Sequence, residues 1–425
     1  MPSTRQVSTR CLIAGGGPAG LMLALLLARA GVEVTVLEKH ADFLRDFRGD
    51  TVHPSTLEVM HELGLLGDFL SRPHDPVHEL RATIGGREQV IADFSRLPTR
   101  CKFIALVPQW EFLDFLRDEA QRHPNFHLLM NTEAVSLVEE GGRVVGVNTT
   151  GPEGALSIRA DLVVGCDGRH SQVRRAAGLA VHDIGAPIDV LWMSLPRVAG
   201  DPDATGGRID RGRFLAMLNR GDYWQCAYVI PKGGIEAVKA RGLAAFREDI
   251  VAIAPLFADR VHLLASWDDI KLLSVTVNRL EQWWKPGLLC IGDAAHAMSP
   301  VGGIGINLAI QDAVAAANIL AAPLAEKSVT AEGLTPFLRQ VQERRMFPTK
   351  ATQRAQVAVQ DRILQPVLAS AGRDAGTLKP PLVLRLMDWI PLLRALPALA
   401  VGVGVRPEHV RSPLILRPTR SLPRG

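Results

Sequence analysis

The segment Cys11-Leu12-Ile13-Ala14-Gly15-Gly16-Gly17-Pro18-Ala19-Gly20 decides the fold of this chain. An apolar run leads into Gly15, Gly17 and Gly20 in the spacing G-x-G-x-x-G, and an apolar, helix-forming stretch follows at once. The first glycine allows a tight strand-to-helix turn, the second lets a pyrophosphate approach the backbone, and the third lets helix and strand pack closely. The free N–H groups and the positive dipole end at the start of the helix favour bound phosphate. The segment therefore predicts a dinucleotide-binding site.

A second apolar run, from Val32 to Leu37, ends at the acidic residue Glu38. In dinucleotide-binding folds an acid at this distance accepts hydrogen bonds from a ribose 2′-OH. Glycine triplets also occur in turns of other α/β proteins, so the triplet alone is weak evidence. The strand, the helix, the second strand and the terminal acid together favour the dinucleotide site.

Composition excludes several classes of function. The chain has 425 residues, enough for two or three domains and a large core. Its net charge of +4 is small for this length, and the absence of a Lys or Arg run argues against nucleic acid as a partner. The five cysteines show neither a C-x-x-C pair nor zinc-ligand spacing, so we expect no metal site and a reduced, cytoplasmic protein. They are Cys11, Cys101, Cys166, Cys226 and Cys290.

No segment is expected to span a membrane. The N-terminus is short and polar, and the apolar stretch 21–30 is too short to cross a bilayer. The apolar stretch 381–405 is interrupted by charged residues and prolines. It is more typical of helices that pack on the body of the protein or at a homodimer contact, with a membrane-touching surface as the alternative.

Two further motifs follow apolar runs that are typical of strands buried on both faces of a parallel sheet. One is Asp167-Gly168-Arg169-His170-Ser171, and the other is Gly292-Asp293-Ala294-Ala295-His296. A glycine-rich stretch with Pro300, Gly303, Gly305 and Asn307 follows the second motif. Open α/β sheets bind ligands at the carboxyl ends of their strands. We therefore expect both acids at the ligand-binding edge.

In this order, the three motifs resemble those of the FAD-dependent aromatic hydroxylases, the para-hydroxybenzoate hydroxylase family of group A flavoprotein monooxygenases. The resemblance covers nearly the whole chain and implies an α/β fold. It implies a Rossmann-type, glutathione-reductase-like FAD-binding domain, an inserted mixed β-sheet substrate domain and a helical C-terminal segment. The expected FAD-binding parts are 1–76, 109–181 and 280–330, the substrate domain takes 77–108 and 182–279, and the helical C-terminal region is 331–425.

The resemblance also implies a set of FAD-binding residues. The glycine turn would hold the pyrophosphate, Glu38 with Lys39 the adenosine ribose, and Asp293 the ribityl chain. Arg48 would lie against the flavin, and Gln109 would reach the ribityl hydroxyls. The stretch from Pro300 to Asn307 would run along the isoalloxazine, where a helix N-terminus favours the anionic reduced flavin. The full set is Gly15, Gly17, Pro18, Ala19, Gly20, Glu38, Lys39, Arg48, Gln109, Asp167, Gly292, Asp293, Pro300, Gly303, Gly305, Ile306 and Asn307.

The implied chemistry belongs mostly to the cofactor. NADPH or NADH would reduce FAD, and O₂ would form a flavin C4a-hydroperoxide that inserts one oxygen atom into an aromatic or polycyclic substrate, as in secondary metabolism. Because the chain has only one G-x-G-x-x-G motif, a second full nucleotide-binding domain is not expected. His170 and Arg174, beside the Asp-Gly motif, are therefore candidates for NAD(P)H docking, with a solvated helix face as the alternative for Arg174.

Residues that act on the substrate are harder to find. No catalytic side chain stands out; His53, Asp50 and Pro300 are candidates because they flank the expected flavin. His296 is more typical of a histidine packed in its loop than of a catalytic base. Four aromatic residues are substrate-contact candidates, although aromatic residues in strands more often fill cores. They are Trp192, Tyr223, Trp224 and Tyr228.

Several other functions stay open at this point. The same fold could serve an epoxidase, a Baeyer–Villiger enzyme or an antibiotic-inactivating monooxygenase. An NAD-dependent dehydrogenase is a rival that leaves the Gly292-Asp293 motif unexplained. A flavin-binding protein without turnover is a third alternative.

Overall fold

An eight-stranded sheet carries the N-terminal motif. In the computed structural model, which describes residues 5–44, 51–152, 154–203, 205–210, 212–326, 328–370 and 382–415, its main strand order is β19-β20-β11-β1-β2-β8. Strands β20, β11, β1, β2 and β8 run parallel, so their carboxyl ends meet at one edge. The strands are β1 (Arg5–Ala14), β2 (Val34–Leu37), β8 (Phe126–Leu129), β9 (Glu133–Glu140), β10 (Arg143–Gly151), β11 (Gly154–Gly165), β19 (Trp284–Lys285) and β20 (Leu288–Cys290).

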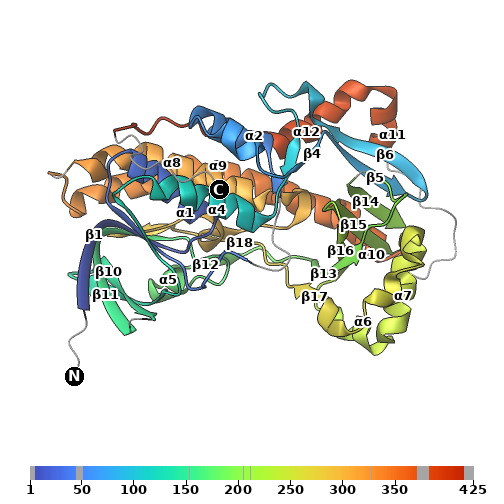
Figure 1. The fold of residues 1–425 in the computed structure, drawn as a ribbon, viewed down its shortest axis with the longest axis horizontal. Helices are drawn as coiled ribbons and strands as arrows, with labels where there is room; N and C mark the ends of the chain where they lie inside the picture. Colours follow the sequence, from blue (N-terminus) through green and yellow to red (C-terminus); the bar gives the residue numbers. More distant parts are fainter. Residues whose placement is uncertain are drawn as a thin grey trace.

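Helices cover this sheet and bury its apolar strands. Helix α1 (Pro18–Arg29) packs against α4 (Gln109–Gln121) and α8 (Gly305–Ala325), and α8 packs against α9 (Thr335–Val359). The long helices α8 and α9 lie side by side above the sheet on the left of Figure 1. The remaining helices of this part are α2 (Pro54–Glu62), α3 (Leu66–Leu70) and α5 (Gln172–Ala176).

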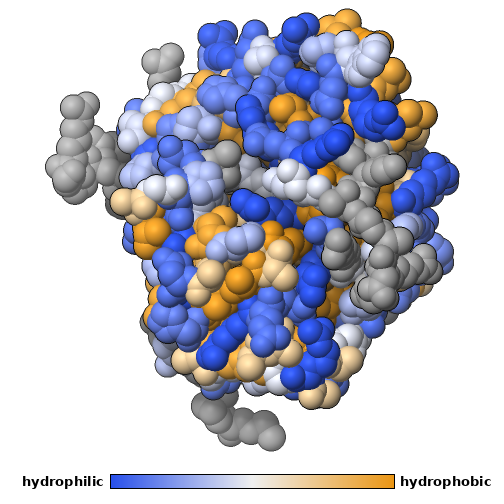
Figure 2. All heavy atoms as spheres, turned by 90° about the vertical axis from the view of Figure 1, so that its right-hand side faces the viewer, coloured by the Kyte–Doolittle hydropathy of each residue, from blue (hydrophilic) through white to orange (hydrophobic). Residues whose placement is uncertain are grey.

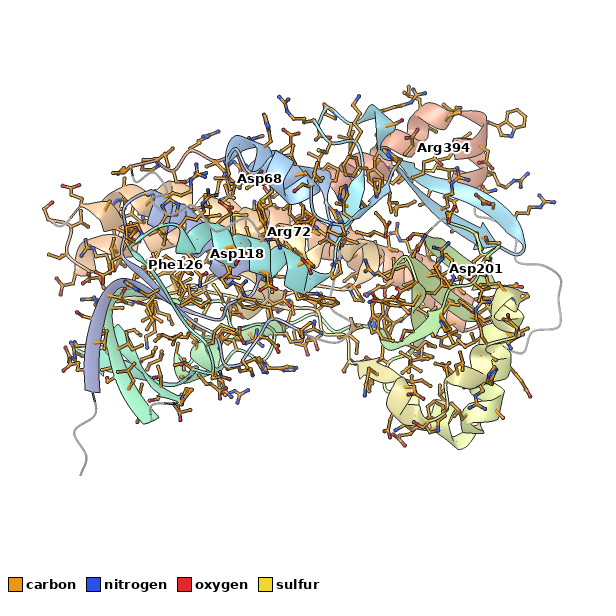
Figure 3. All side chains as sticks on the ribbon, in the orientation of Figure 1. Asp68, Arg72, Asp118, Phe126, Asp201 and Arg394 are labelled. Carbon is orange, nitrogen blue, oxygen red and sulfur yellow. The ribbon has the colours of Figure 1, made fainter. Side chains whose placement is uncertain are left out.

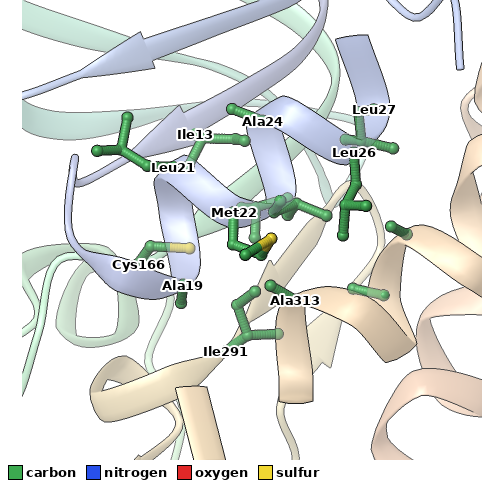
Figure 4. Close-up of a cluster of buried hydrophobic side chains, with 14 of the residues drawn as sticks. Ile13, Ala19, Leu21, Met22, Ala24, Leu26, Leu27, Cys166, Ile291 and Ala313 are labelled. Carbon is green, nitrogen blue, oxygen red and sulfur yellow. The ribbon is translucent and has the colours of Figure 1, made fainter. Parts of the chain in front are cut away.

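The core lies between α1, the sheet and α8. Figure 4 shows Leu21, Met22 and Leu26 of α1 in this core. They pack with Ile13 of β1, with Ile291, which follows β20, and with Ala313 of α8. All six side chains are buried, as the apolar runs of the sequence require. All five cysteines are buried and free, so they pack as small core residues.

A second, seven-stranded sheet has the order β17-β13-β16-β15-β14-β5-β6 and lies on the right of Figure 1. Strands β5 and β6 therefore join strands that follow them by more than one hundred residues in the chain. The strands are β5 (Glu79–Ile84), β6 (Arg87–Asp93), β13 (Ile188–Pro196), β14 (Gly206–Asp210), β15 (Arg213–Asn219), β16 (Tyr223–Pro231) and β17 (Lys271–Leu273).

The sequence predicts mainly strands for 182–279, but two helices interrupt them. They are α6 (Ile235–Ala240) and α7 (Gly242–Ile253), and α7 packs on one face of the second sheet. The prediction missed α7, although its buried residues Phe246, Ile250 and Ile253 recur at helical spacing.

Two small sheets connect the two larger ones. Their orders are β3-β7-β4 and β12-β18-β21. The strands are β3 (Thr51–Val52), β4 (Asp75–Val77), β7 (Ile104–Leu106), β12 (Val181–Asp183), β18 (Asn278–Leu280) and β21 (His296–Ala297). The mixed α/β fold predicted from the sequence is confirmed.

The C-terminal part is helical in the residues described. Helix α9 continues through a π-helical turn (Gln360–Leu364) into α10 (Gln365–Leu368), and Figure 1 shows this continuous rod reaching the second sheet. Helices α11 (Leu382–Trp389) and α12 (Ala395–Gly402) then pack on β6. The right-hand face of the molecule carries hydrophobic and hydrophilic residues intermingled (Figure 2).

Among the described residues, one helical stretch, Val301–Ala325, is long and apolar enough to cross a membrane. Most of it is buried, with 78% of its most apolar window inside the structure. This burial is typical of a core helix of a globular protein, and α8 occupies that position here.

Candidate functional site

The glycine turn between β1 and α1 has the geometry that its sequence predicts. Gly15 has a φ of 111°, and a Cβ atom there would lie 2.4 Å from the Cys166 carbonyl oxygen. A Cβ on Gly20 would lie 2.0 Å from the Gly15 carbonyl oxygen. Both positions therefore require glycine. Around Gly17, which caps α1 without a side-chain hydrogen bond, a Cβ would meet no atom within 4 Å. The start of α1 thus has space and free N–H groups for a phosphate.

Glu38 lies at the end of β2, beside this turn. Its buried carboxylate accepts hydrogen bonds from the backbone N–H groups of Gly16 at 3.1 Å and His40 at 3.0 Å. The acid is therefore held against the glycine turn, while its neighbour Lys39 is exposed. This placement agrees with a carboxylate that reads a ribose next to the pyrophosphate site.

The Asp167 loop follows β11, the strand next to β1 in the sheet. One carboxylate oxygen of Asp167 accepts the Val173 N–H at 3.0 Å, and the other is buried without a partner among the described residues. His170 is exposed on this loop. The Arg174 guanidinium donates to the carbonyls of Arg169 at 2.5 Å and Ala294 at 3.4 Å. Arg174 therefore bridges the Asp167 loop to the Asp293 loop.

The Asp293 loop follows β20 at the same sheet edge. Among the described residues, no group forms a hydrogen bond with the half-buried Asp293 carboxylate. Behind the loop, Asp312 of α8 accepts the Gly292 N–H at 3.1 Å and contacts His296 Nε2 at 2.5 Å. The Arg345 guanidinium of α9 donates to Asp312 at 2.8 Å.

Asp312 stabilises this loop from inside the protein. Burial alone would raise the pKa of Asp312, but His296 and Arg345 lower that pKa below its ordinary value through their charges and hydrogen bonds. His296 is buried and faces this carboxylate, so the structure places it as a histidine packed inside its loop. Asp293, in contrast, is left available to a ligand.

The glycine-rich loop after β21 contacts the start of α2. The Thr51 hydroxyl donates to the Gly303 carbonyl at 2.9 Å, and a Cβ on Gly303, whose φ is 62°, would lie 2.4 Å from that hydroxyl oxygen. The side-chain oxygen Oδ1 of Asn307 accepts from the His53 N–H at 2.8 Å and the Thr56 hydroxyl at 2.7 Å. Gly305 opens α8, and a Cβ there would meet no atom within 4 Å. Ile306 beside it is half-buried.

His53 is completely buried at the N-terminus of α2. Its Nδ1 lies 2.7 Å from the Val401 carbonyl oxygen, which can only accept, so Nδ1 carries the proton. Burial lowers the pKa of His53 to about 4, against the smaller opposing effect of that hydrogen bond. Nε2 is a buried acceptor without a partner among the described residues.

The sequence predicts that four other residues lie near the flavin. Gln109 begins α4 and is half-buried. Pro300 precedes the turn Val301–Gly303 and is half-buried. Arg48 and Asp50 lie outside the described residues.

The residues present fit FAD. The open start of α1, the partnerless buried oxygen of Asp167 and the Asp293 carboxylate lie at one sheet edge. Glycine turns and polar groups of this kind are what a pyrophosphate and a ribityl chain require.

The four aromatic candidates lie on two opposite faces of the second sheet. Trp192 packs against a buried cluster that includes Ala227 and Leu364, and Val301 of the glycine-rich loop packs against the same cluster. Trp224 and Tyr228 instead belong to the core between the sheet and α7. The structure therefore does not bring these two to the flavin-facing side. Tyr223, half-buried, is at the end of β16. By strand alternation it lies on the Trp192 side.

The contacts of Trp224 and Tyr228 are those of packing residues. The Trp224 indole N–H donates to Asp201 at 2.9 Å, and Arg260 donates to the same carboxylate; Figure 3 labels Asp201 beside the second sheet. Tyr228 packs edge-on against Phe246 of α7. Burial, reinforced by Asp249, raises the pKa of Tyr228 to about 12, so it stays protonated.

The sequence did not predict the buried residues that hold the Asp293 loop and the segment before Pro300 in place. Asp312 and Arg345 are separated by 33 positions, and nothing in their local sequence pairs them. Three buried glutamines of α9 and its π-helical turn also hold the backbone before Pro300. Their spacing, at 353, 356 and 360, places three amides on one helix face and is the only local signal of this role.

Comparison with known proteins gives the family. A family model described as FAD binding domain matches residues 8–355. The chain is 36% identical over 418 residues to 6-methylpretetramide 4-monooxygenase of Streptomyces rimosus, covering 97% of this chain and 96% of that protein. It is 30% identical over 319 residues to rifampicin monooxygenase of Streptomyces venezuelae, covering 71% of this chain and 62% of that longer protein.

Solved structures show the same fold. The OxyS anhydrotetracycline hydroxylase from Streptomyces rimosus matches with a TM-score of 0.72 and 23% identity over 94% of this chain and 77% of that chain. The p-nitrophenol 4-monooxygenase PnpA from Pseudomonas putida matches with a TM-score of 0.68 and 22% identity over 95% of this chain and 100% of that chain. The resemblance inferred from the three motifs is confirmed: the chain belongs to the family of FAD-dependent aromatic hydroxylases.

Proposed function

We propose that this protein is an FAD-dependent, NAD(P)H-consuming monooxygenase that inserts one oxygen atom from O₂ into a polycyclic aromatic substrate. One observation carries the proposal: Val301, in the loop expected along the isoalloxazine, packs in the same cluster as Trp192 and Ala216 of the second sheet. The cofactor edge of the first sheet and one wall of the second sheet therefore meet at this loop.

FAD would be held by the residues that converge on the first sheet. The start of α1 would bind the pyrophosphate, Glu38 the adenosine ribose, and Asp293 the ribityl chain. The turn from Pro300 to Gly305 would lie along the ring system. Bound FAD would supply the redox chemistry, taking electrons from NAD(P)H and activating O₂ for transfer of one oxygen atom. The chain itself would orient the substrate and exclude water.

The wall that faces the flavin loop is suited to a flat, apolar molecule. A cross-strand row on this face runs from Trp192 through Ala227 and Ala216 to Gly207. Trp192, Ala216 and Gly207 are half-buried, whereas Leu215 and Trp224 on the opposite face are buried completely. Phe214 packs over Gly207 on the same face, so a planar substrate would stack on the apolar surface of Trp192 and Ala216. The similarity to a monooxygenase named for 6-methylpretetramide supports a polycyclic substrate.

His53 would keep the substrate side of the site neutral. Its protonated Nδ1 is fixed on Val401, and its Nε2 presents an acceptor inside the protein. With a pKa of about 4, the ring carries no charge near neutral pH. It would therefore accept a hydrogen bond from a hydroxyl or N–H group rather than act as an acid.

NAD(P)H would dock transiently at the Asp167 loop. His170 is exposed there, and Arg174 adds positive charge between the two strand-end loops. Replacing both residues with Ala should raise the NAD(P)H concentration needed for half-maximal anaerobic flavin reduction. Unchanged reduction kinetics in stopped-flow measurements would exclude this docking site.

A substrate screen tests the function directly. NADH and NADPH oxidation is followed in the presence of naphthols, anthraquinone phenols and four-ring phenols, with product and H₂O₂ quantified separately. We expect one compound class to stimulate oxidation and to gain one ¹⁸O atom from ¹⁸O₂. Bound flavin without any stimulated oxidation would indicate a non-catalytic flavoprotein, and substrate-dependent NAD⁺ reduction without flavin would indicate a dehydrogenase.

A further inference from the structure

Three buried glutamines on one helix face form hydrogen bonds with the segment that leads into the glycine-rich loop, which is called the flavin-facing loop below because FAD is proposed to lie along it. Gln353 and Gln356 belong to α9, and Gln360 opens the π-helical turn that follows. All three side chains are at most 3% exposed. Their spacing of three and four residues directs them to one side, toward residues 297–301.

Two of the glutamines bind backbone groups, and the third binds the Ser299 side chain. Gln353 Nε2 donates to the carbonyls of Asn278 at 2.8 Å and Ala297 at 3.1 Å. Gln360 Nε2 donates to the Ser299 hydroxyl oxygen at 2.6 Å. The same hydroxyl oxygen accepts the Val301 N–H at 3.2 Å.

Gln356 makes the most extensive contact. Its Oε1 accepts the Ser299 N–H at 3.2 Å, and its Nε2 donates to the carbonyls of Ser299 at 3.0 Å and Val301 at 2.9 Å. Only an amide can accept and donate in this way from one side chain. Glutamate would lose both donors, and an apolar side chain would leave three buried backbone groups without partners.

The same helical element also reaches the substrate-facing wall. Beyond Gln360, Leu364 and Leu368 pack in the cluster that contains Trp192, Ala216 and Val301. A π-helical turn inserted in a long helix changes the direction of the residues that follow, and such turns are frequent at functional sites. One rod thus contacts both the flavin-facing loop and the wall opposite it.

We propose that Gln356 and Gln360 are positioning residues of the flavin site. They fix the backbone from Ser299 to Val301, and thereby place Gly302 and Gly303 at a set distance from the substrate-facing wall. This inference rests on the proposed placement of FAD along the loop. It adds a role for residues that touch neither the expected cofactor nor the reacting atoms.

The test compares two glutamines of the same helix. Gln356→Met removes the clamp on the flavin-facing loop. Gln342→Met is the matched control, because Gln342 clamps the Trp283 N–H at 3.0 Å and the Glu281 carbonyl at 2.9 Å, away from that loop. The readouts are the FAD dissociation constant, the visible circular dichroism of the flavin at saturating FAD, and the unfolding midpoint of the apoprotein.

We expect Gln356→Met to bind FAD at least about tenfold more weakly and to alter the flavin dichroism, because the three hydrogen bonds that hold the backbone of Ser299 and Val301 are lost. Gln342→Met should keep the wild-type values for both flavin readouts, whatever its stability. A folded Gln356→Met protein with the wild-type dissociation constant and dichroism would overturn the proposal. If the wild-type protein bound no FAD, the proposed function would fail instead.

If Gln356→Met does not fold, a second pair of variants tests the proposed positioning role. Gln360→Met and Ser299→Ala each remove one side of the same hydrogen bond. We expect each to change the flavin dichroism, and the double variant to change it no further than the stronger single variant. Wild-type dichroism in both single variants, or additive changes in the double variant, would overturn the proposal.

Discussion

At the scale of single residues, contacts within a short segment were predictable and contacts between distant segments were not. Gly20 is required by the carbonyl oxygen of Gly15 in the same turn. The G-x-G-x-x-G spacing predicts that close approach. The proton on His53 Nδ1, in contrast, depends on the carbonyl of Val401, which lies 348 positions away. No local pattern encodes such a partner.

Asp293 gives the first prediction at this scale. Its carboxylate has no partner among the described residues and lies at the carboxyl end of β20. Asp293→Ala should therefore weaken FAD binding by about 1.5–3 kcal/mol, the typical value of a hydrogen bond to a charged group. Titration followed by flavin fluorescence measures the loss. Asp268→Ala, at an exposed aspartate, is the control, and equal affinity in the two variants would limit Asp293 to a role in its own loop.

His53 gives a prediction about pH. Its pKa is about 4 in the folded protein and about 6.5 when unfolded, so the unfolded state binds the proton first as pH falls. The stabilising contribution of neutral His53 is complete above pH 6.5 and is lost as pH decreases toward 4. Between pH 7 and 4.5 the wild type should lose about 2 kcal/mol more unfolding free energy than His53→Asn, whose amide can still donate to Val401. Parallel pH profiles in urea denaturation of the two proteins would contradict the burial of this ring.

At the scale of helices and strands, the sequence named four aromatic candidates but did not assign them to faces of the sheet. Trp224 and Tyr228 are four residues apart on β16 and therefore share a face, as period-two alternation requires. That this face meets α7, and that Trp192 and Val301 pack against one cluster on the other face, depends on how the second sheet packs. The helix α7 was missed, although its buried residues Phe246, Ile250 and Ile253 recur at helical spacing.

The substrate-facing wall gives a prediction for this scale. Ala216 lies in the centre of the row between Ala227 and Gly207. Ala216→Trp should fill the space beside Trp192 and reduce substrate-stimulated NAD(P)H oxidation at least about tenfold, because a stacked substrate would lose its contact area. FAD content should not change. Ala252→Trp, exposed on α7, is the control. Undiminished stimulation in Ala216→Trp would place the substrate elsewhere.

At the scale of the whole molecule, the order of the three motifs was sufficient for the mixed α/β class and for the family. Each motif follows a strand, and parallel strands bring their carboxyl ends to one edge, so the motifs had to converge. The resemblance placed 77–108 with 182–279 in one domain, but no local pattern predicts that β5 pairs with β14, more than one hundred residues later. The buried charges of Asp312, Arg345 and Glu408 likewise join α8, α9 and the C-terminal segment only in the folded protein.

We expect this chain to form a specific FAD site from its glycine turn, its two strand-end acids and its glycine-rich loop. Titration of the purified apoprotein with FAD, followed by flavin fluorescence and by release of the flavin on denaturation, tests this site most directly. We expect a yellow protein with one non-covalent FAD per chain, and loss of this binding in Gly15→Ala, whose Cβ would overlap the Cys166 carbonyl. A colourless protein that takes up no added FAD would contradict this expectation.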